Sequence, residues 1–478
     1  MQTSFCVCAT TSTMQVLSKC SSVPVTCLEY VHPWTPSCGV ASAEFLVVAL
    51  QDSFRIYMAV YLLSLVMRGR VPTLGDLRRT IRGLMQSTAF LTMSAFSYSI
   101  FLCAIRRALG SYNFYTASYI PAFMAAFCAI LVERPSRRGL LSLYVANVAS
   151  ETGWNILKSR GLVPVSLPHG QIAIFGVSTA ILLYFYRLNR QKDYKDSMFD
   201  VFRFALGESE VMKAQEVPAI EGSRRDSRPR AVGSRSPGST YNVIQMALRA
   251  YVNVISRVKN LSKHELCRHR HSCLYNMLSG GARMFSIGVG IQVLMKVLVQ
   301  ARRLIRKPSL ARRTFLSKDI LKLGCFLGEF TLLYKLSSCL LRHATNSDKA
   351  AFAIPSGLVA SVAFAHYSDN TIALYIMWKM LQTSYNWGIE KGYVPKVPGF
   401  TVFLYCASTA LLFHAATMEP MNLRPSYWKF LHSISGGRIS VMDRSGFNVY
   451  GLATTDQIAQ ISKLCKTKAE VEFRIFDD

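Results

Sequence analysis

The sequence LYVANVASETGWNILKSRGLVP, residues Leu143–Pro164, has a counterpart at Leu374–Pro395, which reads LYIMWKMLQTSYNWGIEKGYVP. Aligned without a gap, the two stretches share the pairs Tyr144/Tyr375, Asn155/Asn386, Gly161/Gly392, Val163/Val394 and Pro164/Pro395. Both copies follow one strongly apolar segment and precede another. Apolar segments of this length are typical of transmembrane helices. The repeated stretch therefore predicts an all-α, multi-pass membrane protein with an internal duplication.

The composition favours the same class of protein. Of the 478 residues, 51% are hydrophobic and 17% are charged, and the apolar residues come in long blocks. The formal net charge of +28 then lies in loops, a linker and flanks, where basic residues contact anionic lipid headgroups or set the topology. The sequence contains no ordered motif of aromatic and basic residues, so we expect no nucleic-acid partner.

Each half is predicted to contain four membrane spans. The spans of the first half are Met85–Ile105, Tyr115–Val132, Leu140–Leu157 and Gln171–Tyr186. Those of the second half are Leu323–Leu341, Ala350–Tyr367, Thr371–Ile389 and Phe400–Met418. Two further apolar segments, Ile56–Met67 and Met284–Val299, are shorter than the roughly 20 residues that a span needs. We interpret them as interfacial or re-entrant helices, which gives about eight spans, or up to ten if both cross.

The basic residues distinguish four spans per half from five. With five, the halves would be inverted, and the basic loop Arg302–Lys318 would face away from the basic linker. With four, that loop, the linker, the turn ERPSRRG (Glu133–Gly139) and the basic C-terminal flank share one side. The positive-inside rule prefers the second arrangement, which predicts two parallel four-helix units.

These units set the expected domain boundaries. Residues 1–38 form a cysteine-rich N-terminal loop, 39–186 the first transmembrane repeat, 187–266 a basic flexible linker, 267–418 the second repeat and 419–478 a C-terminal tail. The centre of the linker, Gly222–Thr240, is rich in Ser, Arg, Pro and Gly, which predicts disorder. It is either a solvated tether or a lipid-docking segment that serine phosphorylation releases.

Four charged residues lie inside the expected spans: Glu151, Glu329, Lys335 and Lys379. Because a charge in hydrocarbon is costly, each should face the bundle interior, a partner or water. They mark either a transport or proton path, or cross-helix pairs that serve packing. Small residues four apart (Gly324/Gly328, Gly357/Ser361, Ala122/Ala126 and Gly176/Ala180) predict helices that approach closely.

Two loops carry candidate metal ligands: Cys27, His32 and Cys38 in the first half, and Cys267, His269, His271 and Cys273 in the second. Thiolate and imidazole are the ligands of structural zinc, and the loops hold equivalent places in the duplication. Together they offer enough ligands for one zinc site. Neither loop has the tight CxxC spacing of a strong zinc signature, and the alternative is reduced thiols with solvated histidines. Cysteines inside the spans, among them Cys103 and Cys339, are interpreted as inert packing residues.

No catalytic motif supports an enzyme. The sequence lacks HExxH, GxSxG, a Walker loop, GxGxxG and a paired-carboxylate motif in a usable context. We therefore expect a protein without enzymatic activity and, apart from zinc, without a cofactor. A metal-dependent membrane enzyme would rest on the two Cys/His loops alone.

Four stretches resemble the transmembrane protein 135 family, also called peroxisomal membrane protein 52. They are CLEYVHPWTPSC (Cys27–Cys38), ERPSRRGLLSLYVANVASET (Glu133–Thr152), ARMFSIG (Ala282–Gly288) and NLRPSYWKFL (Asn422–Leu431). The resemblance identifies a signature turn at Glu133, Arg134, Arg137 and Arg138. The first copy of the repeated stretch carries this lead-in together with Glu151, whereas the second has SDN before it and Gln382 at the aligned position.

The resemblance implies a multi-pass protein of peroxisomal and mitochondrial membranes. Family members are linked to the balance of mitochondrial fission and fusion, to peroxisome organisation and to lipid metabolism. The family is also distantly similar to the protein translocase channels of the mitochondrial inner membrane. We therefore expect a regulator that contacts anionic lipids and fission-machinery proteins; the alternative is a transporter or channel for a lipid, metabolite or polypeptide.

Overall fold

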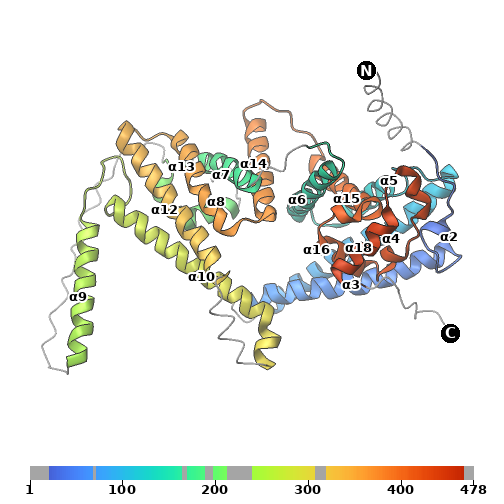
Figure 1. The fold of residues 1–478 in the computed structure, drawn as a ribbon, viewed down its shortest axis with the longest axis horizontal. Coiled ribbons are helices and arrows are strands. Elements are labelled where there is room, and N and C mark those ends of the chain that lie inside the picture. The colour runs from blue at the N-terminus through green and yellow to red at the C-terminus, as the bar shows by residue number, and fades with distance from the viewer. Residues whose placement is uncertain are drawn as a thin grey trace, which may run out of the picture. The chain divides into compact units, whose positions relative to one another are not determined.

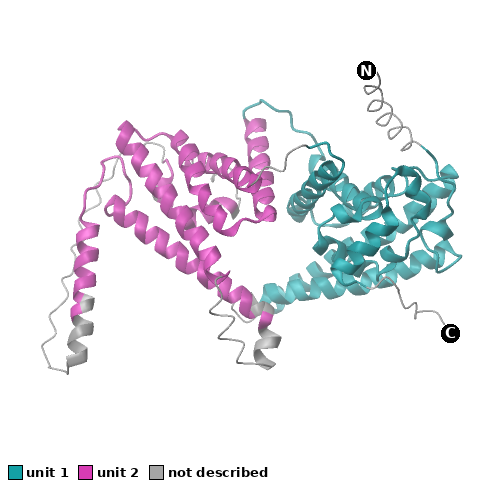
Figure 2. Cartoon of the chain, in the orientation of Figure 1, with its two compact units in different colours: residues 1–166, 391–478 teal, residues 167–390 magenta. Residues whose placement is uncertain are grey.

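The computed structural model describes residues 21–67, 72–163, 169–188, 197–212, 239–306 and 319–467. Within these ranges all regular structure is helical, apart from an isolated bridge between Val23 and Tyr112 (Figure 1). The all-α prediction is confirmed. The chain forms two compact units, one from residues 1–166 and 391–478 and the other from residues 167–390 (Figure 2). We call these unit 1 and unit 2.

Unit 1 contains the first long helices and the end of the chain. Its helices are α2 (Cys27–Tyr30), α3 (Cys38–Met67), α4 (Leu74–Leu109), α5 (Tyr119–Val132), α6 (Pro135–Ser159), α15 (Phe400–Met418), η5 (Pro420–Asn422), α16 (Pro425–Ile434), α17 (Arg438–Val441), η6 (Ser445–Tyr450) and α18 (Thr454–Cys465). Helix α4 begins at a capping box, in which Thr73 and Asp76 bond each other's backbone N–H. It ends at Gly110, whose φ of 72° suits a residue without Cβ.

Unit 2 contains the middle of the chain. Its helices are α7 (Gly170–Arg187), α8 (Ser197–Leu206), η2 (Glu208–Glu210), α9 (Ser239–Lys259), α10 (Cys273–Arg306), α12 (Asp319–Thr345), η3 (Ala350–Phe352), α13 (Ala353–Ala360), η4 (Ser361–Tyr367) and α14 (Asn370–Glu390).

The two units pair their helices in the same order. In unit 1, α3 packs on α4, α4 on α5, and α15 on both α5 and α6; in unit 2, α10 packs on α12, α12 on α13, and α7 on both α13 and α14. Helix α7, expected to complete the first repeat, thus completes unit 2, while α15 completes unit 1. The linear ranges 39–186 and 267–418 therefore do not coincide with the compact units. Matching pairs are what a duplication would produce, and the duplication itself stays a prediction.

Small residues let α7 pack in unit 2. A Cβ at Gly357 of α13 would lie 2.8 Å from the Cα of Ala180, and one at Gly176 would lie 3.4 Å from the Cβ of Ser361. The small pairs 176/180 and 357/361 thus face each other, as their four-residue spacing predicts. Helix α7 also buries Phe175, Leu182 and Leu183 in the core of unit 2.

In the part of the chain that the structure describes, seven segments are long and apolar enough to cross a membrane: Cys38–Leu65, Leu74–Leu109, Gly170–Arg187, Cys273–Val297, Asp319–Thr345, Ala350–Tyr367 and Phe400–Met418. The prediction of a multi-pass membrane protein is confirmed. The set of spans differs from the expected one. Ile56–Met67 lies within the uninterrupted helix α3, because Gln51, Asp52 and Arg55 stay helical, and Met284–Val299 lies within α10. Both helices are among the seven, whereas the sequence predicted interfacial or re-entrant segments. Three predicted spans, Tyr115–Val132, Leu140–Leu157 and Thr371–Ile389, lie in α5, α6 and α14, which are not among the seven. Helix α5 is apolar but has only 14 residues.

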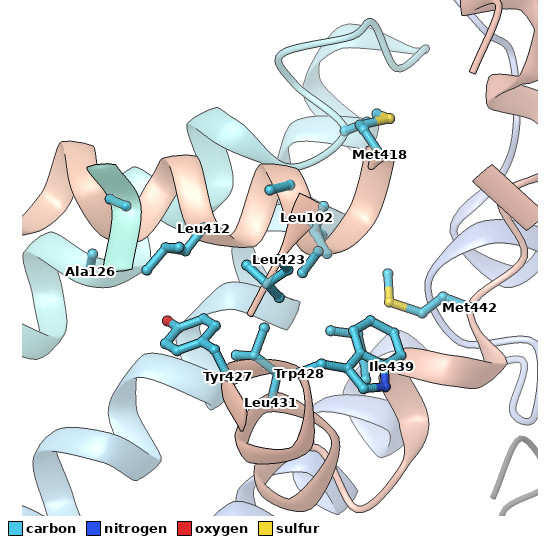
Figure 3. Packing of buried hydrophobic residues seen from close by; sticks show 14 of the residues in the cluster. Leu102, Ala126, Leu412, Met418, Leu423, Tyr427, Trp428, Leu431, Ile439 and Met442 are labelled. Carbon is cyan, nitrogen blue, oxygen red and sulfur yellow. The ribbon is translucent and has the colours of Figure 1, made fainter. Parts of the chain in front are cut away.

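The expected linker and tail both contain packed elements. Helix α8 lies in the range 187–266, yet Phe199, Phe202 and Leu206 are buried in the core of unit 2. Residues 213–238 lie outside the described part of the chain, and they include all of Gly222–Thr240 except its last two residues. In the range 419–478, Trp428 and Phe447 are fully buried. Figure 3 shows the α16 side chains Tyr427, Trp428 and Leu431 beside Leu423 and Ile439.

Candidate metal centres

The first cluster of metal-ligating side chains comprises Cys27, His32, Cys38 and Cys103, whose ligand atoms all lie within 4.8 Å of one another. The Nε2 atom of His32 lies 3.3 Å from the Sγ of Cys38. On the other side of the ring, Nδ1 lies 2.8 Å from the Thr35 carbonyl oxygen. Because a carbonyl only accepts, Nδ1 carries the proton and Nε2 keeps a lone pair for a metal.

The second cluster comprises Cys267, His269, Cys273 and Cys339, with ligand atoms within the same 4.8 Å. The sulfur of Cys267 lies 3.8 Å from that of Cys273 and 4.0 Å from that of Cys339. A tetrahedral ion with Zn–S bonds of about 2.3 Å places its sulfur ligands about 3.8 Å apart. His269 repeats the arrangement of His32, since its Nδ1 donates to the His271 carbonyl oxygen at 2.6 Å.

The two clusters draw their ligands from equivalent places. Cys38 and Cys273 are the first residues of α3 and α10. Cys103 and Cys339 each lie six residues before the last residue of α4 and α12. Each cluster thus joins a loop to the start of one long helix and the end of the helix packed against it.

The sequence predicted one shared site, and the structure contains two separate four-residue clusters instead. Cys103 and Cys339, interpreted as packing residues, complete them. His271 is not a member of either cluster: its carbonyl orients His269, and its ring packs edge-on against Tyr275. A signal for the fourth ligand existed in the matching positions of Cys103 and Cys339 before the ends of their helices.

One cysteine in each cluster is biased toward the thiolate, which is the metal-binding form. A hydrogen bond from the Cys103 thiol lowers the pKa of Cys27 to about 6, against the opposing effect of burial. A hydrogen bond from the Cys339 thiol lowers the pKa of Cys267 to about 3, again against burial. Both cysteines lie outside the candidate spans.

The clusters differ in access. In the first, Cys38 is exposed, Cys27 and Cys103 are half-buried, and these three cysteines line an open groove of about 960 Å³. In the second, Cys267 and Cys339 are buried and His269 is 5% exposed.

Comparison with protein families places the first cluster in a known region. The family model described as the N-terminal cysteine-rich region of Transmembrane protein 135 matches residues 24–157. Over residues 24–157 the chain carries the cysteine-rich region of the transmembrane protein 135 family. All four residues of the first cluster lie inside the matched region, whereas the second cluster lies beyond it. No solved structure matches the chain. The more distant similarity to translocase channels stays a prediction.

The turn that the resemblance predicts as a signature, Glu133–Arg138, joins the other end of the α3–α4 pair to α5 and α6. Glu133 is 1% exposed and lies 3.5 Å from Arg137, whose guanidinium also donates to the Tyr61 hydroxyl on α3 at 3.1 Å. Arg134 donates to the Gln86 side chain on α4 at 2.7 Å. The Arg138 guanidinium donates to the Glu133 carbonyl. These contacts hold the hairpin between α5 and α6 against α3 and α4, so the turn has a structural role.

The charges predicted inside the membrane have partners within their own units. Glu151 pairs with Arg424, and Glu329 lies 2.7 Å from His366. Lys335 donates to Asn276 at 3.2 Å and Lys379 to Gln382 at 3.1 Å. This pattern favours packing pairs over a transport path.

The first copy of the repeated stretch contacts the segment after α15. Besides the Glu151–Arg424 pair, Asn155 donates to the Asn422 carbonyl at 3.1 Å, and Arg160 pairs with Glu419. Two of the family-like motifs, Glu133–Thr152 and Asn422–Leu431, therefore meet in unit 1. The second copy has Gln382 in place of Glu151, and Gln382 accepts from Lys379 on its own helix instead.

Proposed function

We propose that this protein is a non-enzymatic regulator in peroxisomal and mitochondrial membranes, acting on the balance of mitochondrial fission and fusion, on peroxisome organisation and on lipid metabolism. The match of residues 24–157 to the cysteine-rich region carries this proposal, because those are the processes that the family resemblance implies. Its partners are fission-machinery proteins, contacted through the basic loops and linker.

The closed geometry of the clusters supports a non-enzymatic role. A catalytic zinc site keeps a coordination position open for water or substrate, whereas a structural site uses four protein ligands. Each cluster here supplies four, Cys₃His in both cases. We propose that the ion is zinc, since thiolate and imidazole together favour it over harder cations.

Bound zinc would link helices that otherwise meet only by packing. In unit 1 it would hold the loop residues Cys27 and His32 against the start of α3 and the end of α4. In unit 2 the same links would join α10 and α12. The chemistry that the ion supplies is coordination alone, and the carbonyls of Thr35 and His271 orient the two imidazoles for it.

Metal analysis of the purified full-length protein tests the zinc assignment. We expect two zinc ions per chain, and about one in each of the single variants Cys103→Ser and Cys339→Ser. Cys128→Ser and Cys406→Ser are matched controls, because these cysteines also lie in helices but outside the clusters. Loss of zinc in the controls equal to that in the cluster variants, or a wild-type protein without stoichiometric zinc, would refute the assignment.

Cell imaging tests the organelle role. Deleting Gly222–Thr240 and neutralising the basic residues of Arg302–Lys318 should shift mitochondrial length and peroxisome number and reduce proximity labelling of fission proteins. Neutralising Arg78 and Arg79, which are exposed on α4 and lie outside both segments, is the control for lost charge. Unchanged organelles and unchanged neighbours would contradict the proposal.

The alternative, a transporter or channel, has less support, because each of the four charged residues predicted inside the membrane has a hydrogen-bond or ion-pair partner. Reconstituted protein that moved an acyl or small-metabolite substrate, with transport lost in Glu151→Gln but not in an exposed control such as Asp319→Asn, would favour it over the regulator.

A further inference from the structure

The groove beside the first cluster lies between α3 and α4. Its walls are apolar along most of their length, with Ala43 and Leu46 on α3 and Phe96 and Ile100 on α4. Leu46 and Ile100 are 38% and 39% exposed. At one end the groove reaches the cluster cysteines and two arginines, Arg106 and Arg107.

The groove exists because α3 and α4 lack the close contact that glycines give the equivalent pair in unit 2. Between α10 and α12, a Cβ at Gly288 would lie 2.8 Å from the Cα of Gly324, so the two backbones touch. In unit 1, side chains lie between the helices, and the hydroxyl of Ser99 bonds that of Ser42 at 3.4 Å. The Ser42 and Ser99 hydroxyls thus bond each other, and the exposed walls at Leu46 and Ile100 are left apolar.

The arginines lie where the headgroup of a lipid would. Both are in the last turn of α4, which is a candidate span, so they lie near a membrane–water boundary. Arg106 is held in place, since its Nε donates to the Val25 carbonyl at 2.6 Å. Arg107 is exposed. The acidic group interacting with Arg106 is Glu29, which is itself exposed.

The dimensions fit one acyl chain. From Arg107 down to Phe96 the helix rises about 16 Å, at about 1.5 Å per residue, with Ile100 between them. We propose that this groove binds an anionic phospholipid, with one acyl chain along Leu46, Phe96 and Ile100 and the phosphate on Arg106 and Arg107. This inference rests on the membrane character of unit 1 and not on its cellular role. An apolar channel that ends in paired positive charge complements an amphiphile with a negative head.

A lipid bound in the groove would also cover the cysteines of the first cluster. Cys27, Cys38 and Cys103 line the headgroup end of the groove, so a bound lipid covers them. Lipid occupancy should therefore slow the reaction of these thiols with a chelator or an alkylating reagent.

Native mass spectrometry of the full-length protein in detergent micelles tests the proposal. Phosphatidic acid and phosphatidylcholine with identical acyl chains are the probes. We expect the wild type to retain one phosphatidic acid in preference to phosphatidylcholine, and Arg106→Gln/Arg107→Gln to lose that preference by about tenfold. Arg78→Gln/Arg79→Gln, exposed on the first turns of the same helix, is the matched control.

Two further variants separate the parts of the groove. Ile100→Trp should block the acyl chain and reduce binding of both lipids with the arginines intact, while Arg107→Gln alone should weaken only phosphatidic acid. Thermal unfolding in micelles reports whether each variant is folded. The proposal is overturned if the double arginine variant keeps its preference, if the control pair loses it equally, if Ile100→Trp leaves lipid retention unchanged, or if a protein rather than a lipid co-purifies at the groove. Organelle morphology in cells tests the proposed cellular role and is independent of lipid binding in the groove.

Discussion

The helix pairs α3–α4 and α10–α12 both carry a Cys₃His cluster at equivalent positions, but the contacts along the pairs differ. Gly281, Gly288, Gly324 and Gly328 bring α10 and α12 into backbone contact. Between α3 and α4, larger side chains leave a groove of about 960 Å³. Access to the clusters follows this packing: the first lies on the open groove, whereas in the second every residue except the half-buried Cys273 is buried. The same ligand set can therefore serve an accessible site and a closed one.

The two units also differ in how their buried charged side chains are paired. In unit 2, Arg342 and Glu210 are each 1% exposed and lie 2.7 Å apart, and Asp348 pairs with both Arg342 and Arg187. Glu210 comes from η2, Arg187 ends α7, and Arg342 lies on α12. This network therefore holds α7 and the packed part of the linker against α12. In unit 1 the buried charges form separate pairs instead of a network, with Arg438 3.1 Å from Glu44 and Arg137 3.5 Å from Glu133. Unit 2 should accordingly be the more sensitive to loss of a charge.

The largest expected effect is that of Glu210→Ala. Removing Glu210 leaves the buried Arg342 guanidinium with only one of its two carboxylate partners, Asp348, and breaking a buried pair costs about 3–5 kcal/mol. Thermal unfolding of the micellar protein measures the change. Asp319→Ala is the control, because its partner Lys322 is exposed and such pairs contribute little. Equal effects of the two substitutions would contradict the role assigned to the network.

Gly288→Ala should have the next largest effect. Its methyl group would meet the Leu323 carbonyl oxygen at 2.8 Å, and such overpacking costs about 1–3 kcal/mol. Gly290→Ala, two residues further on the same helix, meets nothing within 4 Å and should instead stabilise the helix by about 0.5–1 kcal/mol. Unfolding curves measure the two changes in the free energy of unfolding, which should have opposite signs. If both destabilise alike, α10 and α12 do not pack as described.

Access to the clusters predicts the order of metal loss. A chelator should remove zinc from Cys339→Ser, which keeps the first cluster, about tenfold faster than from Cys103→Ser, which keeps the second. Tenfold in rate corresponds to about 1.4 kcal/mol in the barrier. Colorimetric detection of released zinc measures both rates. Release in the opposite order would show that exposure does not govern exchange.

The smallest effect concerns pH. Burial acts to raise the pKa of Asp348, but Arg187 and Arg342 outweigh it and hold that pKa below its ordinary value. A carboxyl with a depressed folded pKa stabilises the fold above its unfolded pKa, and this stabilisation is lost as the pH falls through the folded value. Asp348→Asn should therefore destabilise unit 2 at neutral pH and converge with the wild type in acid. Unfolding curves that stay parallel down to acid would contradict this.

Much of this organisation can be read from the amino-acid order. Long apolar blocks require a helical membrane protein, since only satisfied backbones enter hydrocarbon. Six of the eight cluster ligands lie in two short loops and were identified there. The small pairs at 176/180 and 357/361 predicted close packing, and their helices do pack together.

Tertiary structure decided the rest. The apolar face of α7 predicts that it is buried, but nothing local selects α13 and α14 over α5 and α6 as its partners. Cys103 and Cys339 resemble any thiol inside a span, and they become ligands only because a helix pair closes and brings them to a loop more than 60 residues earlier. The sequence assigns Trp428 to a C-terminal tail, whereas the structure buries it in the core of unit 1. Periodicity records how much of a helix is buried, whereas the identity of the neighbour depends on contacts between residues far apart in the chain.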